Sequence, residues 1–77
     1  MSKLPVVSAQ ECIRALQAAG FEIRRQKGSH IIMKRRAPPP VRTIPVPNHK
    51  TIKPGTLKSI IRQAGLTVNE FNELLKK

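Results

Sequence analysis

Two histidines are the residues of this chain whose type and setting could do acid–base chemistry. His30 follows Gly28 and Ser29 at the start of an alternating apolar and polar segment, and His49 lies in a loop with Pro, Asn and Lys. Nearby positive charge disfavours the imidazolium form, so we expect a neutral ring at His30. A neutral imidazole beside a phosphate backbone can take the proton from an RNA 2′-hydroxyl. A structural role or a plain phosphate contact is the alternative for His30, and His49 is open to the same readings.

The overall charge predicts a polyanionic partner. The 77 residues include 15 Lys and Arg against 4 Asp and Glu, a net charge of +11 with neutral histidines. Nucleic acid is the first candidate, because phosphate neutralisation with counterion release scales with the cations presented. A solvated charged face is the alternative. The candidate phosphate-binding residues gather on and beside the predicted strands: Arg24, Gln26, Lys27, Lys34, Arg35 and Arg42.

Composition excludes several classes of protein. The chain has no Asp and four scattered Glu, so a carboxylate-held two-metal nuclease or a glycosidase-type carboxylate pair is not expected. One cysteine, Cys12, makes neither an internal disulfide nor a structural zinc site, and we expect it to be buried on a helix. No stretch is long and apolar enough to span a membrane, and residues 1–5 lack the apolar core of a signal peptide. We expect a cytoplasmic protein without a metal or other cofactor.

Three helices are predicted from caps and apolar spacing. A helix over residues 9–19 follows the capping box of Ser8 and Glu11 and ends at Gly20. A second helix starts at Pro54, and a third follows a capping box formed by Thr67 and Glu70. The second helix carries an apolar stripe and ends at a glycine, at positions Leu57, Ile60, Ile61, Ala64 and Gly65.

Strands are predicted over 21–26, 30–35 and 41–47. A three-residue loop at 27–29 would pair Gln26 with His30 and Ile23 with Met33. That register places His30 on the face turned away from the core, together with Arg24, Gln26, Ile32 and Lys34. The opposite face then carries the apolar residues Phe21, Ile23, Ile31 and Met33. The third segment contains Pro45 and Pro47, so it must be an edge strand or a poorly paired one.

The element order is helix, strand, strand, strand, helix, helix. The simplest arrangement is an α+β fold, a three-stranded antiparallel sheet with helices on one face. We expect a single domain over residues 1–77, with its core at about 8–75.

At this level of detail the chain resembles HicA-type toxins. The resemblance rests on Lys27-Gly28-Ser29-His30, on the segment 43–47 (TIPVP), on His49, and on the segment 53–65 (KPGTLKSIIRQAG), and it spans about residues 8–75. Gly-Ser-His alone is a weak signal, but joined in order to Pro-Gly-Thr-Leu and Gln-Ala-Gly it is specific.

The resemblance implies a fold like that of double-stranded RNA-binding domains and the activity of an mRNA interferase that needs no ribosome. It implies a HicB-type antitoxin partner that covers the active surface, and we expect the free toxin to be a monomer. The family's catalytic histidine falls on His30, whereas the second of two consecutive histidines in many members is Ile31 here, and a further recurrent histidine falls on His49. The expected RNA-binding residues are Arg24, Gln26, Lys27, Gly28, Ser29, Lys34, Arg42 and His49.

Three functions follow as hypotheses. The first is a metal-independent endoribonuclease toxin with His30 as general acid and base and with Lys and Arg stabilising the phosphate. The second is a non-catalytic RNA-binding module that grips the phosphate backbone. The third is an interaction protein whose charge docks an acidic partner.

Overall fold

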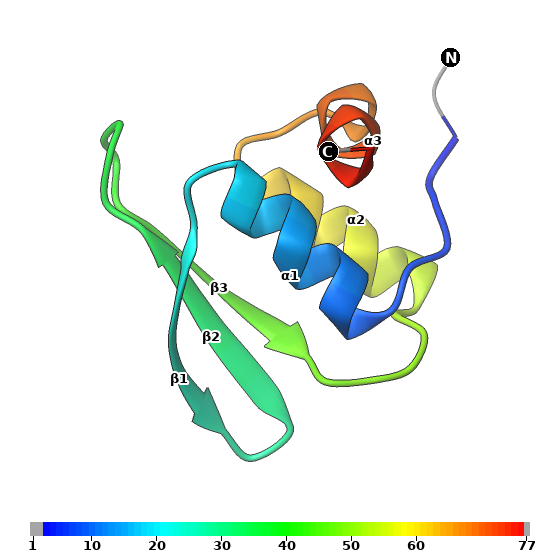
Figure 1. Cartoon of the computed structure of the whole chain (residues 1–77), viewed down its shortest axis with the longest axis horizontal. Helices are drawn as coiled ribbons and strands as arrows, with labels where there is room; N and C mark the ends of the chain where they lie inside the picture. Colours follow the sequence, from blue (N-terminus) through cyan, green and yellow to red (C-terminus); the bar gives the residue numbers. More distant parts are fainter. Residues whose placement is uncertain (1–2, 77) are drawn as a thin grey trace.

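A computed structural model describes residues 3–76; Met1, Ser2 and Lys77 of the expected domain lie outside the described residues. The described chain forms three helices and three strands in the predicted order (Figure 1). They are α1 (Ala9–Ala18), β1 (Glu22–Lys27), β2 (His30–Arg35), β3 (Arg42–Pro47), α2 (Pro54–Gln63) and α3 (Val68–Leu75). The α+β class is therefore confirmed. No helix within residues 3–76 is long and apolar enough to cross a membrane.

Both predicted capping boxes are present. Glu11 N donates to Ser8 Oγ at 3.2 Å, and Ser8 N donates to the Glu11 carboxylate at 2.9 Å. The same reciprocal pair joins Thr67 and Glu70 at the start of α3. These bonds satisfy amide groups that a helix leaves without internal partners, which is why both helices begin at these positions.

The sheet has the order β1-β2-β3 with both pairs antiparallel. Helices lie on one side of it, and α1 and α2 pack against β3 (Figure 1). The face of the sheet towards the helices contributes four buried side chains to the core, Ile31, Met33, Ile44 and Val46. β3 is an edge strand, as its two prolines predicted.

The hairpin of β1 and β2 differs from the predicted register near its turn. The predicted three-residue loop at 27–29 is wrong: the loop contains only Gly28 and Ser29. Lys27 therefore lies opposite His30, and Gln26 lies opposite the buried Ile31. Directly opposite residues share a face of the sheet, so Gln26 is not on the face of His30.

A β-bulge corrects the register further along the hairpin. Arg24 is the extra residue of β1, and Arg25 lies opposite Ile32. Beyond the bulge the two pairs are as predicted, Ile23 with Met33 and Glu22 with Lys34. The two-residue turn thus places Arg25 and Lys27 on the open face, where we expected Arg24 and Gln26, and the bulge restores the predicted pairs beyond them.

β1 contributes little to the core. All its residues are exposed, and Ile23, predicted on the buried face, keeps 51% of its surface in contact with solvent. β1 pairs only with β2, on the side of the sheet away from β3 and its helices (Figure 1). The layer of helices does not extend over β1, so the apolar residue of this strand stays exposed although it lies on the side of the helices.

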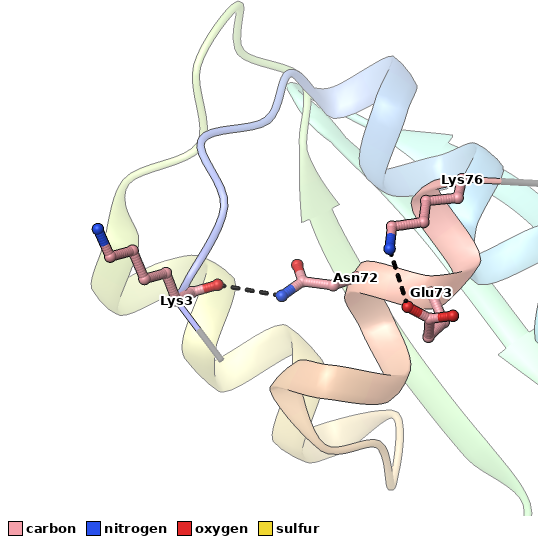
Figure 2. Close-up of polar contacts among 4 residues, drawn as sticks. All are labelled: Lys3, Asn72, Glu73 and Lys76. Atoms are coloured by element: carbon pink, nitrogen blue, oxygen red, sulfur yellow. Dashed lines mark hydrogen bonds and ion pairs between the residues drawn. The ribbon is translucent and has the colours of Figure 1, made fainter. Parts of the chain in front are cut away.

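The N-terminal segment is held by contacts with distant parts of the chain. Asn72 Nδ2 of α3 donates to the carbonyl oxygen of Lys3 at 3.1 Å (Figure 2). Ile52 N donates to Val7 O at 2.9 Å. These bonds fix the approach to α1 against α3 and against the segment that leads into α2.

Candidate functional site

A groove of about 530 Å³ lies at the β3 edge of the sheet, between that strand and α2. It brings together His30 and His49, the two histidines selected from the sequence. The groove is lined from the sheet by His30, Pro45 and Pro47, from the following segment by His49 and Lys53, and from α2 by Gly55, Thr56, Ser59, Ile60 and Gln63.

His30 owes its position to the tight turn and to strand alternation. Gly28 has φ 61° at the first of the two loop positions, where such loops favour glycine. His30 is the next residue after the loop and pairs with Lys27 on one side and Pro47 on the other. Because the following residue, Ile31, is 8% exposed and faces the helices, His30 faces the opposite way and is exposed.

The backbone around His49 is fixed by three hydrogen bonds. Asn48 N donates to Ser29 O at 2.7 Å, and His49 N donates to Pro47 O at 2.9 Å. The carbonyl of His49 accepts from Ala9 N, the first residue of α1, at 3.1 Å. The loop is therefore tied to the hairpin turn and to α1 while the histidine itself remains exposed.

The amino end of α2 borders the groove without a side-chain cap. Pro54 occupies the first turn, and the side chain of Lys53 makes no capping hydrogen bond. Gly55 and Thr56 of this first turn line the groove. A helix start carries free amide groups and partial positive charge, both of which favour an anion.

The open face of the sheet adds cations beside this groove. Ile32 and Lys34 share the face of His30, because every second residue of a strand points to the same side. Lys27 and Arg25 share it too, because they lie opposite His30 and Ile32. Gln26 points elsewhere, and its Nε2 donates to Gly28 O at 3.2 Å, which braces the turn. Within residues 3–76 the only salt bridge joins Lys76 and Glu73 (Figure 2). None of these open-face cations therefore forms an ion pair, although Glu22 lies opposite Lys34 on the same face.

Arg42 and Arg35 do not belong to this surface. They lie opposite each other, and each is two residues away from a buried residue of its strand. Both are therefore on the helix-covered face, at the end of the sheet far from the hairpin turn. Arg42 Nη1 donates to Gln63 O at the end of α2 at 3.1 Å. Arg35 Nη1 donates to Ala19 O after α1 at 3.4 Å, and its guanidinium lies 4.9 Å from the centre of the Phe21 ring. Each arginine thus stabilises the negative end of a helix.

Cys12 is fully buried in α1, as predicted. Burial raises the pKa of its thiol to about 12, so the thiol stays protonated at neutral pH.

Several residues of the groove and the open face were not among the expected site residues. Lys53, Thr56, Ser59 and Gln63 line the groove, and Arg25 lies on the open face. The sequence contained a signal for three of them, because positions 56, 59 and 63 have the spacing of one helix face. In the structure, Gln63 Nε2 donates to Ser59 Oγ at 3.0 Å. The face of Arg25 depends on the length of the turn, which we predicted to be one residue longer than it is.

The chain matches a known family over most of its length. The family described as HicA toxin of bacterial toxin–antitoxin systems matches residues 9–66. The matched segment runs from the first residue of α1 to beyond α2 and contains every residue that lines the groove. A comparison with curated proteins found no match. The chain therefore belongs to the HicA toxin family of bacterial toxin–antitoxin systems.

Proposed function

We propose that this toxin is a metal-independent endoribonuclease that cleaves mRNA, with His30 as the general base. One observation carries the proposal. Two exposed histidines line one groove with Lys53 and the uncapped start of α2, and no carboxylate lies among the described residues that line it. Membership in the HicA family, whose members are mRNA interferases, supports the same activity.

The reaction uses the RNA's own hydroxyl as the nucleophile. His30 takes the proton of a 2′-hydroxyl, and the oxygen attacks the adjacent phosphorus. The O2′–P bond forms as the P–O5′ bond breaks, and the products are a 2′,3′-cyclic phosphate and a 5′-hydroxyl. The proton of the 2′-hydroxyl stays on His30, and the departing O5′ takes up one proton from a second donor, so the step balances.

The surroundings of His30 suit the charge that develops at phosphorus. Lys53 and the amide groups of Gly55 and Thr56 are the donors that would stabilise the additional negative charge. Lys27 lies directly opposite His30 and would hold a neighbouring phosphate. We assign the rest of the RNA backbone to the exposed turn residues Gly28 and Ser29 and to the open-face cations Arg25 and Lys34, with Arg24 at the bulge.

Cleavage of a labelled RNA in EDTA tests the proposal. Wild-type protein should cut, and His30→Ala should cut about 10²–10⁴-fold more slowly, the usual contribution of a general acid or base. Because His30 is exposed, the variant should keep the wild-type thermal midpoint. Lys58→Ala is the matched control and should leave the rate unchanged, since Lys58 does not line the groove but a neighbouring hollow between α2 and α3.

Two results would contradict the proposal in different ways. Equal rates for wild type and His30→Ala would remove His30 from the mechanism. Salt-dependent binding of RNA that stays intact would identify the protein as a binding module instead.

Membership in the HicA family implies an antitoxin partner. We propose that the partner is a HicB-type protein that covers the groove of His30, and that the free toxin is a cytoplasmic monomer. If the antitoxin covers this groove, RNA and antitoxin compete, and Lys27→Ala should weaken both interactions while Lys58→Ala weakens neither. Simultaneous binding of both ligands in a titration would exclude this mode of inhibition.

A further inference from the structure

Breaking the P–O5′ bond requires a second proton transfer that His30 does not supply. When His30 has taken the proton of the 2′-hydroxyl, the departing O5′ still needs a proton from another group. The groove residues that can carry a transferable proton are the two histidines and Lys53. Imidazole is the side chain that ordinarily titrates near neutral pH, whereas a lysine ammonium ordinarily holds its proton to about pH 10. This chemistry selects a histidine.

The backbone holds the two histidines in a fixed relation. Ser29 and Asn48 each immediately precede a histidine, and they are joined by a hydrogen bond of 2.7 Å. On the other side, His30 pairs with Pro47, which is two residues before His49 and accepts its amide proton at 2.9 Å. The spacing between the backbones at His30 and His49 therefore depends on short, direct connections.

Beyond His49, the surface next to the groove continues towards the start of α1. His49 also lines a second hollow of about 300 Å³ at the start of α1, with Ser8, Ala9 and Gln10 among its other residues. His30, in contrast, adjoins the hairpin turn and the open-face cation Lys27. The nucleotide that carries the attacking hydroxyl can thus lie towards the sheet while the leaving nucleotide passes His49 towards α1.

We propose that His49 is the general acid that protonates O5′ of the leaving nucleotide, an inference that rests on the proposed ribonuclease function. In the step, His30 gains the proton of the 2′-hydroxyl, the O2′–P bond forms and the P–O5′ bond breaks. His49 gives its proton to O5′ and becomes neutral. Exchange of protons with solvent then restores both rings.

A substrate with a sulfur in place of the bridging O5′ tests this role directly. A thiolate leaves without protonation, so the general acid becomes dispensable on this substrate. His49→Ala should cleave ordinary RNA about 10²–10⁴-fold more slowly than wild type, but should come within about tenfold of wild type on the sulfur substrate. His30→Ala should remain slow on both substrates.

The controls separate chemistry from folding and charge. His49→Ala keeps the backbone hydrogen bonds of residue 49, so its thermal midpoint should match the wild type. His49→Gln, which keeps a polar side chain that cannot donate a proton in this step, should behave as His49→Ala does. Lys58→Ala removes a cation that lines neither of the two hollows that contain His49, and it should cleave both substrates at the wild-type rate.

Three results would overturn the inference. An equal defect of His49→Ala on both substrates would make His49 a binding residue, and the proposed function would stand. Full activity of His49→Ala on ordinary RNA would remove it from the reaction altogether. If the wild type cleaves neither substrate, the proposed ribonuclease function fails and the role of His49 fails with it.

Discussion

Replacing Gly65 by alanine should destabilise the protein through a side chain that is distant in the sequence. Gly65 follows α2 with φ 74°, and a Cβ built there would lie 2.8 Å from Cζ of Arg42. That guanidinium is held by its hydrogen bond to Gln63 O. The substitution therefore acts twice, through backbone strain and through the displacement of Arg42.

The two effects have comparable magnitudes. A left-handed conformation costs a non-glycine residue about 1–2 kcal/mol. Swinging Arg42 away loses a charged hydrogen bond, worth about 1.5–3 kcal/mol when buried and about 1 kcal/mol at this half-exposed position. Gly65→Ala should thus lower the free energy of unfolding by about 2–3 kcal/mol. For a domain of this size each kcal/mol corresponds to about 4–8 °C in the thermal midpoint.

The protein contains its own control at the end of α1. Gly20 also has a positive φ, 98°, and follows a helix whose end is contacted by an arginine, Arg35. A Cβ there would lie 3.5 Å from Arg35 Cδ, an ordinary contact, so Gly20→Ala should show the backbone strain alone. Urea unfolding of both variants, alone and with Arg42→Ala, measures each contribution.

The double mutant isolates the contact between the two residues. In the Arg42→Ala background, Gly65→Ala should cost only about as much as Gly20→Ala, a coupling of about 1 kcal/mol. Strictly additive effects of Gly65→Ala and Arg42→Ala would refute the reasoning, as would equal costs for Gly65→Ala and Gly20→Ala in the wild-type background.

Three further predictions concern stability and reactivity. The hydrogen bond from the Ser8 backbone, then that with the Ser8 side chain, lowers the pKa of Glu11, so this contact stabilises the fold above the unfolded-state pKa and is lost as pH falls through the folded-state value. Glu11→Gln should therefore lower the urea midpoint more at pH 7 than in acid, where the Glu11 carboxyl is protonated; an equal loss at both would show that the charge of Glu11 does not contribute. At a pKa of about 12, about one Cys12 thiol in ten thousand is ionised at pH 8, so a thiol reagent should label native protein only as fast as the protein unfolds; rapid labelling would show that α1 is not packed. Met33→Ala should cost about 2–5 kcal/mol and Ile23→Ala, its cross-strand partner, less than about 0.5 kcal/mol; similar urea midpoints for the two variants would place β1 in the core.

Local chemistry explains what could be predicted from the residues alone. The starts of α1 and α3 depend on hydrogen bonds between residues three apart, and the sequence contains both partners of each capping box. The edge position of β3 follows from its prolines, which lack a donor. The exposure of His30 follows from alternation with Ile31, and this held even though the predicted turn was wrong.

Tertiary structure alone decided which side chains meet. The turn of two residues places Arg25 on the face of His30, and the bulge at Arg24 returns Ile23 to the side of the helices. The helices leave β1 uncovered, so Ile23 stays exposed all the same. Arg42, expected at the phosphate surface, instead binds the end of α2, because the sheet brings residues 42 and 63 together. Residue types, and hydrogen bonds between residues close in the sequence, determined the helices and strands and identified the two candidate histidines. The groove that joins them depends on long-range packing of α2 and of the segment before it, which has no signature in the neighbouring residues.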